Sequence, residues 1–551
     1  MTASGIGRIT VLAYVSPSRS PALPPSMLPR RIRACISTIS VWSRRSKLAD
    51  LFADLRKNNG EATGSVLRLH GSAGHRETTD SLINGKQRAS IMFRPHQNRR
   101  LCSQRGHRWT VTMSRASRHP LESGQSRSSA WMLNRYAAVP ISACVFALIA
   151  SPLILYFLAP VETDYQARIF WPSMAAITVV FAAQNRSRSG GIIWPPHILC
   201  LFACLAFAGV SVLWAFKPES SFVRFLQQVM IVISIIVPAL LADPRADIMR
   251  ALFVCFAFAS ILNVFFVLGG EPEFANYGAM GLVKIGYPGY FLGKNYLGEC
   301  ASLALLLSIN EVFHPGLRRT QGIIVMAVAI FLVFAAESKT ALGLAILCPI
   351  LAAFTLFVAK KMRVSPAVVL VSIPLCYAVL SSVSNFSVNR LSYELYGDST
   401  LTGRTIIWDF AKAEIERRPL FGWGYQSFWL VGPDAPSVMD APGWVKTMPN
   451  SHNGYYDATV EMGYIGYYLL LICLIATLHA TGRVMLRDPV RAWLLLSVAL
   501  YFLCFNYLES LWLRGFEFLW VVFLIVSAEI GRYWQVLPQK SAAYGSRIPV
   551  S

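Results

Sequence analysis

The chain has 551 residues, of which 54% are hydrophobic and only 15% are charged, and its formal net charge is +22 at pH 7. Soluble globular domains carry about a quarter charged residues. This sequence instead returns repeatedly to apolar runs of about 20 residues, the length that crosses the hydrocarbon core of a bilayer. The composition therefore excludes an ordinary soluble domain and predicts an all-α integral membrane protein.

The first 131 residues carry most of the positive charge. They hold 22 Lys and Arg against 6 Asp and Glu, a balance of +16 out of the total of +22. The arginines are scattered among Ser, Gly and His, without the aromatic residues of a nucleic-acid-binding surface. We therefore expect residues 1–131 to be a disordered extension that binds no nucleic acid. An organellar transit peptide is one alternative, and a true start at Met132, directly before the first apolar run, is another.

Residues 132–551 form the predicted membrane domain, which has twelve apolar spans. The expected spans are residues 136–158, 169–184, 192–215, 222–242, 248–268, 291–313, 321–336, 340–359, 364–384, 455–480, 490–506 and 516–531. With the N-terminal end inside, every loop assigned to the cytoplasm is basic and the short outer loops are nearly free of Lys and Arg. Because basic residues are retained on the cytoplasmic side, this pattern supports both the number of spans and the orientation.

Two outer loops are long, residues 269–290 and residues 385–454. Loops of more than about 15 residues are usually functional or disordered. The second loop contains four tryptophans and a helix signal, so we expect it to fold against the outer face of the membrane. Functional residues are therefore sought in these two loops.

The sequence lacks the motifs of several kinds of chemistry. Nine of the eleven cysteines fall within spans and two fall in the basic extension, so the spacing implies neither a disulfide framework nor a zinc site. The sequence has no Walker-type phosphate loop and no HExxH motif. ATP-driven pumping and zinc proteolysis are therefore unsupported, and we expect neither a metal nor a cofactor.

A helix is predicted at residues 402–418, with Arg404 in its first turn. Its apolar side suits the membrane surface, Trp408 suits the interface, and Glu414 is expected to face water. The free N–H groups and the positive dipole end of a first turn favour an anion and disfavour an arginine. A phosphate partner therefore explains Arg404 better than helix capping does, with a solvated surface arginine as the alternative.

His452 lies at the outer end of the tenth span, beside Asn453, in the segment PNSHNGYYDATVEMGYIGYY. An imidazole has a near-neutral pKa, and at the mouth of a membrane cavity it can take a proton from a hydroxyl group. A lone histidine is more often a structural hydrogen-bonding group. Residue chemistry alone leaves both interpretations open.

Charged and polar residues also open two other spans. Lys294 and Asn295 begin the sixth span in FLGKNYLG, and Lys339 precedes the eighth in AAESKTAL. Charges at such depth are often retained for function, although snorkelling of both lysines to the interface explains them equally well. The predicted topology places both lysines, Arg404 and His452 on the outer side. This convergence favours a common site.

At this point the sequence resembles the O-antigen ligases and bacterial polysaccharide polymerases. The signature of this family is a histidine, a small amide or hydroxyl residue, nine further residues, and two glycines separated by two residues. The sequence matches it with His452 and Asn453, the segment GYYDATVEM, and Gly463 and Gly466. The GKNYLG, SKTAL and GRTIIW segments resemble family positions in the same order.

The resemblance implies a bundle of about twelve helices related to the GT-C membrane glycosyltransferases. It implies a multi-pass protein of the bacterial inner membrane whose active site, with the large loop 385–454, faces the periplasm. The implied reaction is the metal-independent transfer of a glycan from undecaprenyl diphosphate to an acceptor hydroxyl, without a cofactor.

The implied catalytic residues are His452, as the base, and Arg404, which stabilises the diphosphate. The residues expected to bind substrate are Lys339, Lys294, Asn295, Asn453 and Trp408. Lys339 departs from the family pattern, in which arginine is common at this position. Lysine keeps the charge but lacks the planar fork of a guanidinium.

Three functions remain open. The first is a polymerase that joins lipid-linked repeat units of an exopolysaccharide or capsule, with a flippase and a chain-length regulator of the same pathway as partners. The second is a ligase that attaches a finished glycan to a lipopolysaccharide core or a protein. The third is a twelve-span secondary transporter of saccharides or lipids, which should show related halves and polar residues at mid-membrane. Here the polar residues gather at one outer end instead.

Overall fold

The structure is a computed structural model. It describes residues 141–150, 169–184, 192–242, 246–276, 282–384, 394, 403–515 and 517–535. The basic extension at residues 1–131 and the alternative start at Met132 lie outside the described residues.

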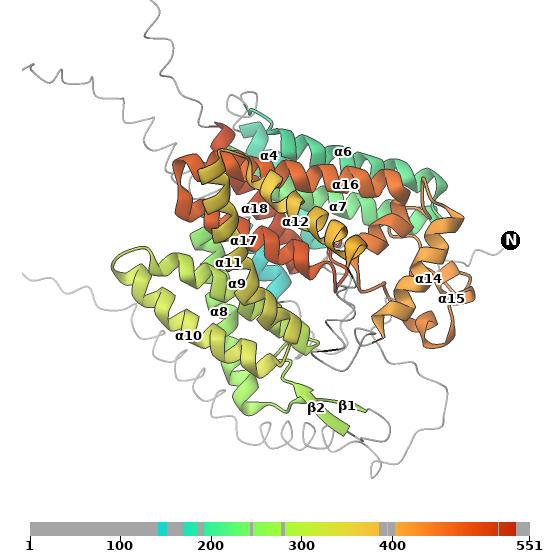
Figure 1. Cartoon of the computed structure of the whole chain (residues 1–551), viewed down its shortest axis with the longest axis horizontal. Coiled ribbons are helices and arrows are strands. Elements are labelled where there is room, and N and C mark those ends of the chain that lie inside the picture. The colour runs from blue at the N-terminus through green and yellow to red at the C-terminus, as the bar shows by residue number, and fades with distance from the viewer. Residues whose placement is uncertain are drawn as a thin grey trace, which may run out of the picture. The chain divides into compact units, whose positions relative to one another are not determined.

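The described part is mostly helical and forms a bundle (Figure 1). Its helices are α4 (Trp171–Gln184), α6 (Pro196–Val210), α7 (Pro218–Leu241), α8 (Ile248–Gly269), α9 (Lys294–Val312), α10 (Leu317–Ala336), α11 (Lys339–Met362), α12 (Pro366–Val383), α14 (Arg404–Arg417), α15 (Pro436–Met439), α16 (Gly454–Arg487), α17 (Pro489–Phe505) and α18 (Phe518–Gln535). Two short 3-10 helices are η3 (Ser211–Trp214) and η5 (Gly443–Thr447).

A helix occupies each of the twelve predicted spans, the first of them over residues 141–150 only. Within the described residues, seven helices are long and apolar enough to cross a membrane. They are α6 continued by η3, α7, α8, α10, α11, α12 and α16. A mostly helical membrane protein is therefore the observed class. The number of twelve spans and the relation to GT-C enzymes stay predictions.

The first long outer loop contains a β-hairpin that the all-α prediction missed. Strand β1 (Glu273–Asn276) pairs antiparallel with β2 (Leu282–Gly286), with Phe274 opposite Lys284. The strand sequences EFAN and LVKIG do not alternate apolar with polar residues, which is the pattern by which strands are recognised in a sequence. The backbone N–H of Tyr287 donates to the carbonyl of Ala335 at 3.0 Å. The end of the hairpin is therefore attached to the last turn of α10.

The helices pack around a buried apolar core. α9 packs along α10, and α16 packs along α6, as Figure 1 shows. The side chains of α18 are almost all buried, including Trp520 and Phe523. In contrast, α10, α11 and α12 expose apolar residues such as Phe334, Ile350 and Leu375. Exposed apolar faces on long helices are suited to contact with lipid.

The second long outer loop is folded over residues 403–454. Its apolar residues form a separate cluster with one residue of α16. The cluster consists of Ile407, Phe410, Ala411, Ile415, Phe428, Trp429, Ala441, Val445 and Val460. Because Val460 belongs to α16, the cluster fastens the loop to the tenth predicted span.

One prediction about α14 is wrong. Glu414 was expected to face water, but it is buried and pairs with Arg417 at 2.9 Å. Residues separated by three, four and seven positions share one face of a helix, and Glu414 lies seven residues after the buried Ile407. The carboxylate therefore lies on the apolar face of α14, and burial raises its pKa.

Candidate functional site

Four helices begin close together at one end of the bundle. α9 begins with Lys294, α11 with Lys339 and α14 with Arg404, while α16 begins two residues after His452. Residues 506–515, in the connection between α17 and α18, lie among these helix starts and contact them. The structure thus gathers the predicted site residues at one end.

Glu509, in the connection between α17 and α18, links these segments. Its Oε2 lies 3.0 Å from Nδ1 of His452, and its Oε1 lies 3.0 Å from Nη2 of Arg404. The same Oε1 accepts a hydrogen bond from the amide of Asn295 at 3.3 Å. Sequence reasoning missed Glu509, because it lies in a short loop without a motif. The only signal in the sequence was a carboxylate just after the outer end of the eleventh predicted span.

The contact with Glu509 orients the imidazole of His452. An ionised carboxylate only accepts hydrogen bonds, so Nδ1 is the nitrogen that carries the proton in the neutral ring. Nε2 then keeps its lone pair and can act as a base. The side chain of His452 is 31% exposed, so a hydroxyl group can reach it.

The backbone at His452 has a left-handed conformation, with φ of 50°. Such a conformation is uncommon for residues other than glycine and is maintained by its surroundings. The N–H of His452 donates to Oδ1 of Asn450 at 2.9 Å. On either side, Ser451 N–H donates to Asp457 at 3.0 Å, and Asn453 N–H donates to the hydroxyl of Ser510 at 3.1 Å. The turn is therefore held from both sides.

Asn453 and Trp408, both predicted to bind substrate, are buried beneath this turn. Oδ1 of Asn453 caps α16 by accepting hydrogen bonds from Tyr455 N–H at 3.0 Å and Tyr456 N–H at 3.2 Å. The indole N–H of Trp408 donates to the carbonyl of Ser451 at 3.0 Å. These contacts position the His452 turn. Direct contact of either side chain with a substrate stays a prediction, and their burial speaks against it.

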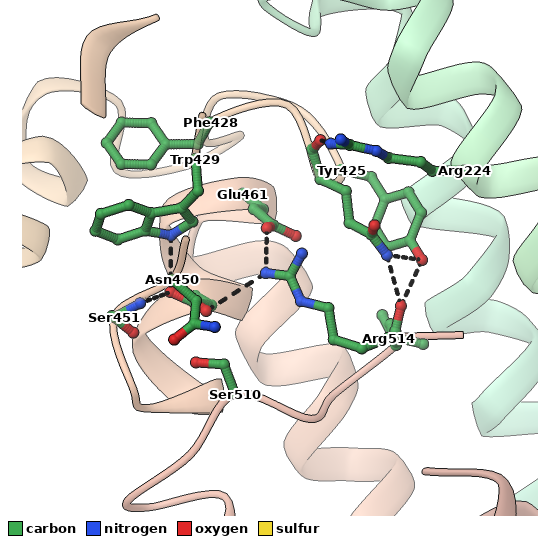
Figure 2. A network of polar contacts seen from close by, with 12 residues as sticks. Arg224, Tyr425, Phe428, Trp429, Asn450, Ser451, Glu461, Ser510 and Arg514 are labelled. Carbon is green, nitrogen blue, oxygen red and sulfur yellow. Dashed lines mark hydrogen bonds and ion pairs between the residues drawn. The ribbon is translucent and has the colours of Figure 1, made fainter. Parts of the chain in front are cut away.

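A second ionic network lies next to the turn (Figure 2). Arg514 contacts Glu461 at 2.6 Å and Asp457 at 3.4 Å, and Asp457 also accepts a hydrogen bond from the indole of Trp429 at 2.9 Å. Burial alone would lower the pKa of Arg514, but the carboxylates of Glu461 and Asp457 outweigh it and raise that pKa. Since Asp457 also holds Ser451, the network joins three elements: the α17–α18 connection, α16 and the folded loop.

The glycines of the signature mark a break in α16. Gly463 has φ of 63° and ψ of −172°, which interrupts the helix. A Cβ atom at this position would lie 2.2 Å from the carbonyl carbon of Leu420. The backbone of the folded loop fills the break: Tyr464 N–H donates to Pro419 at 2.7 Å, and Trp423 N–H donates to Val460 at 2.9 Å. Only glycine permits both this conformation and this close approach.

Three of the converging helices begin with a cation. α9, α11 and α14 have no side-chain cap and no acidic residue in the first turn. Their positive dipole ends add to the charges of Lys294, Lys339 and Arg404. At α9 a carboxylate already meets this charge, because the N–H of Lys294 donates to Oε2 of Glu273 at 3.5 Å. The three helix starts together concentrate positive charge at one end of the bundle.

The polar partners of these helix starts connect them. Lys294 donates from Nζ to the carbonyl of Ile285 in β2 at 2.6 Å, and Ser338 donates to Oδ1 of Asn295 at 3.2 Å. Lys294 and Lys339 are close enough to repel each other electrostatically. Arg404 already has an anionic partner in the carboxylate of Glu509. Its positive charge is therefore paired within the protein, without the phosphate that the sequence suggested. Among the described residues, no group of His, Cys, Asp and Glu side chains is placed to hold a metal ion.

Comparison with known proteins agrees with the motifs. Residues 324–471 match the model of a family described as O-antigen ligase. The chain is also 26% identical over 315 residues to the "Exopolysaccharide production protein ExoQ" of Rhizobium meliloti (strain 1021), an alignment that covers 53% of this chain and 67% of that protein. The resemblance to the O-antigen ligase and polysaccharide polymerase family is thereby confirmed.

The matched region contains only part of the site. Lys339, Arg404 and His452 lie within residues 324–471, whereas Lys294 and Glu509 lie outside them. The fold of the helix bundle brings Lys294 and Glu509 close to the matched residues.

Proposed function

We propose that this chain is a membrane glycosyltransferase, on the basis of the match of residues 324–471 to a family described as O-antigen ligase. In this proposal it transfers a glycan from undecaprenyl diphosphate to an acceptor hydroxyl at the periplasmic face of the bacterial inner membrane. The observation that carries the proposal is the shared carboxylate of Glu509, which contacts both His452 and Arg404. It places a candidate base and a candidate anion-binding group side by side.

His452 is the proposed general base. Nε2 takes the proton of the acceptor hydroxyl while that oxygen attacks the anomeric carbon of the donor glycan. Nδ1 of His452 remains hydrogen-bonded to Glu509, whose negative charge stabilises the imidazolium that forms. A base in this position typically contributes a factor of about 10² to 10⁴ in rate.

The proposed leaving group is the undecaprenyl diphosphate. As the bond between the anomeric carbon and the diphosphate oxygen breaks, its electron pair and growing negative charge leave with the diphosphate. Arg404, Lys339 and Lys294, with the positive dipole ends of the helices that they begin, are suited to stabilise this charge. The lipid diphosphate is itself an activated donor, so the proposed reaction needs no nucleotide. Metal independence is part of the proposal.

Polymerisation of repeat units is the favoured form of this activity. The similarity to a protein described by its role in exopolysaccharide production favours an exopolysaccharide as the product. The proposed partners are a flippase and a chain-length regulator of the same pathway. A ligase is the second candidate, because the matched family is described as O-antigen ligase. The O-antigen ligase match gives no support to a secondary transporter.

The test is to express His452→Ala and His452→Gln in a strain that lacks the chromosomal copy. Polymer and lipid-linked glycans are then measured by mass spectrometry. We expect loss of polymer with normal protein abundance, and His314→Ala serves as the matched control because Nδ1 of His314 donates a local hydrogen bond to the carbonyl of Asn310. Accumulated single repeat units indicate a polymerase, and accumulated long lipid-linked glycans indicate a ligase. An active His452→Gln at normal abundance removes the base assignment.

A further inference from the structure

A second feature lies away from the candidate site. A groove of about 840 Å³ runs between α6, α12, α16 and the end of α18. Most of its wall is aliphatic, with Val368, Val371 and Leu375 from α12 and Ile472 and Ile475 from α16. Figure 1 shows α12 crossing close to α16. Three of the four helices, α6, α12 and α16, are long and apolar enough to cross a membrane. The groove therefore opens on a surface suited to lipid.

The groove lies toward the end of the bundle opposite His452. α16 starts next to His452 and ends at Arg487, and its contribution to the groove lies in the second half, between Ile472 and Arg483. α12 contributes its first half, directly after the basic segment that ends at Arg363. The groove is therefore separate from the candidate site at His452.

One end of the groove is basic. Arg483 stacks on Trp534, with 4.1 Å between the guanidinium carbon and the ring centroid, and His479 lies one turn away. None of the residues that line the groove is acidic. Within the described residues, Arg483 forms no ion pair. Stacking leaves the N–H edge of a guanidinium available to oxygen ligands.

Two other arginines at this end of the bundle differ from Arg483. Arg318 pairs with Glu311 at 2.6 Å, and Arg491 pairs with Asp247 at 3.0 Å. Their charges are compensated within the protein, whereas the charge of Arg483 is presented to the groove.

The length of the groove matches one leaflet of a bilayer. Between Ile472 and Arg483, α16 advances by about 16 Å at 1.5 Å per residue. The hydrocarbon layer of one leaflet is about 15 Å thick, half of a typical bilayer core. An aliphatic groove of this length with a cation at one end suits an acyl chain and an anionic headgroup.

We propose that this groove binds an anionic phospholipid, with an acyl chain along α12 and α16 and the headgroup phosphate on Arg483. By the distribution of basic loops, this is a lipid of the cytoplasmic leaflet. The proposal does not depend on the proposed function, because neither the groove nor Arg483 belongs to the candidate site.

The test uses the full chain in nanodiscs that contain phosphatidylglycerol with a photoactivatable diazirine on one acyl chain. A matched sample contains phosphatidylcholine with the same acyl chain. After irradiation, labelled peptides are identified by mass spectrometry. We expect phosphatidylglycerol to label the peptides that contain Val368–Leu375 and Ile472–Arg483. We expect Arg483→Ala to reduce this labelling about fivefold, the factor that one basic residue contributes at an anionic membrane surface.

The control variant is Arg319→Ala, which removes an exposed positive charge from the same end of the bundle outside the groove. It should leave the labelling unchanged. Equal labelling by the two lipids, or full labelling of Arg483→Ala, overturns the proposal. Absence of labelling from both groups of peptides in the unmodified chain, with either lipid, also overturns it, because the groove then holds no acyl chain.

Discussion

Glu509 and His452 lie 57 positions apart in the sequence, yet Oε2 of one is 3.0 Å from Nδ1 of the other. The backbone of Gly454 explains this proximity, because its N–H donates to the carbonyl of Asn506 at 2.8 Å and to that of Glu509 at 3.0 Å. A Cβ atom at Gly454 would lie 2.3 Å from Oδ1 of Asn506. The loop between α17 and α18 therefore docks directly on the first residue of α16, beside the His452 turn.

The first prediction concerns Glu509→Gln. Glutamine keeps the size of the side chain but removes the negative charge that stabilises the imidazolium of His452. We expect the initial rate of polymer formation in membranes to fall by about 10², within the range that a general base contributes, while protein abundance is unchanged. Glu416→Gln is the control, since Glu416 is an exposed carboxylate on α14. A wild-type rate in Glu509→Gln would show that the carboxylate plays no part in the reaction.

The second prediction concerns Arg404. Lysine at this position keeps a positive charge but cannot form two parallel hydrogen bonds to a diphosphate. Arg404→Lys should therefore raise the KM for the lipid-linked donor and lower kcat, and Arg404→Ala should impair both further. Lys412→Ala, on the same helix, is the control because Lys412 pairs with Asp409 on the exposed face. If Arg404→Ala is fully active, the residue only joins α14 to Glu509.

The third prediction concerns the break in α16. Gly463→Ala adds a Cβ atom 2.2 Å from the backbone of Leu420 at a φ of 63°. We expect the amount of folded protein in the membrane to fall, because a strained backbone conformation costs about 1 to 3 kcal/mol before the clash is counted. Gly443→Ala is the matched control: Gly443 also has a positive φ, of 47°, but a Cβ atom there meets open space. Equal losses in both variants would attribute the effect to φ alone.

The sequence predicted the parts of the site that lie in local motifs. His452 and Gly463 fall within one short signature, and Arg404 and Lys339 each begin a helix, so their positions were found from neighbouring residues. Glu509 and Arg514 were not found. Each acts on residues more than fifty positions away, and their own loop carries no periodic or motif signal.

Errors within elements had a different cause. Glu414 was assigned to water because of its charge, although its spacing from Ile407 already placed it on the buried face of α14. Charge is therefore a weaker guide to orientation than helical spacing when a partner such as Arg417 is available at one turn's distance. The β-hairpin at Glu273–Gly286 was missed because its two strands, EFAN and LVKIG, do not alternate apolar with polar residues.

The last prediction concerns the orientation of the folded loop, on which the proposed donor and the site both depend. Met439, at the end of α15, has a side chain that is 64% exposed, and residues 403–454 contain no cysteine. The basic loops predict that this region faces the periplasm, so a cysteine introduced by Met439→Cys should react with a membrane-impermeant maleimide in intact spheroplasts. Arg319→Cys, at an exposed position in the first turn of α10, should react only after lysis, and the unmodified chain reports the background of the native cysteines. Labelling of Arg319→Cys but not of Met439→Cys in intact spheroplasts would invert the topology. His452 would then face the cytoplasm, where a lipid-linked glycan that has already been flipped to the periplasm cannot reach it.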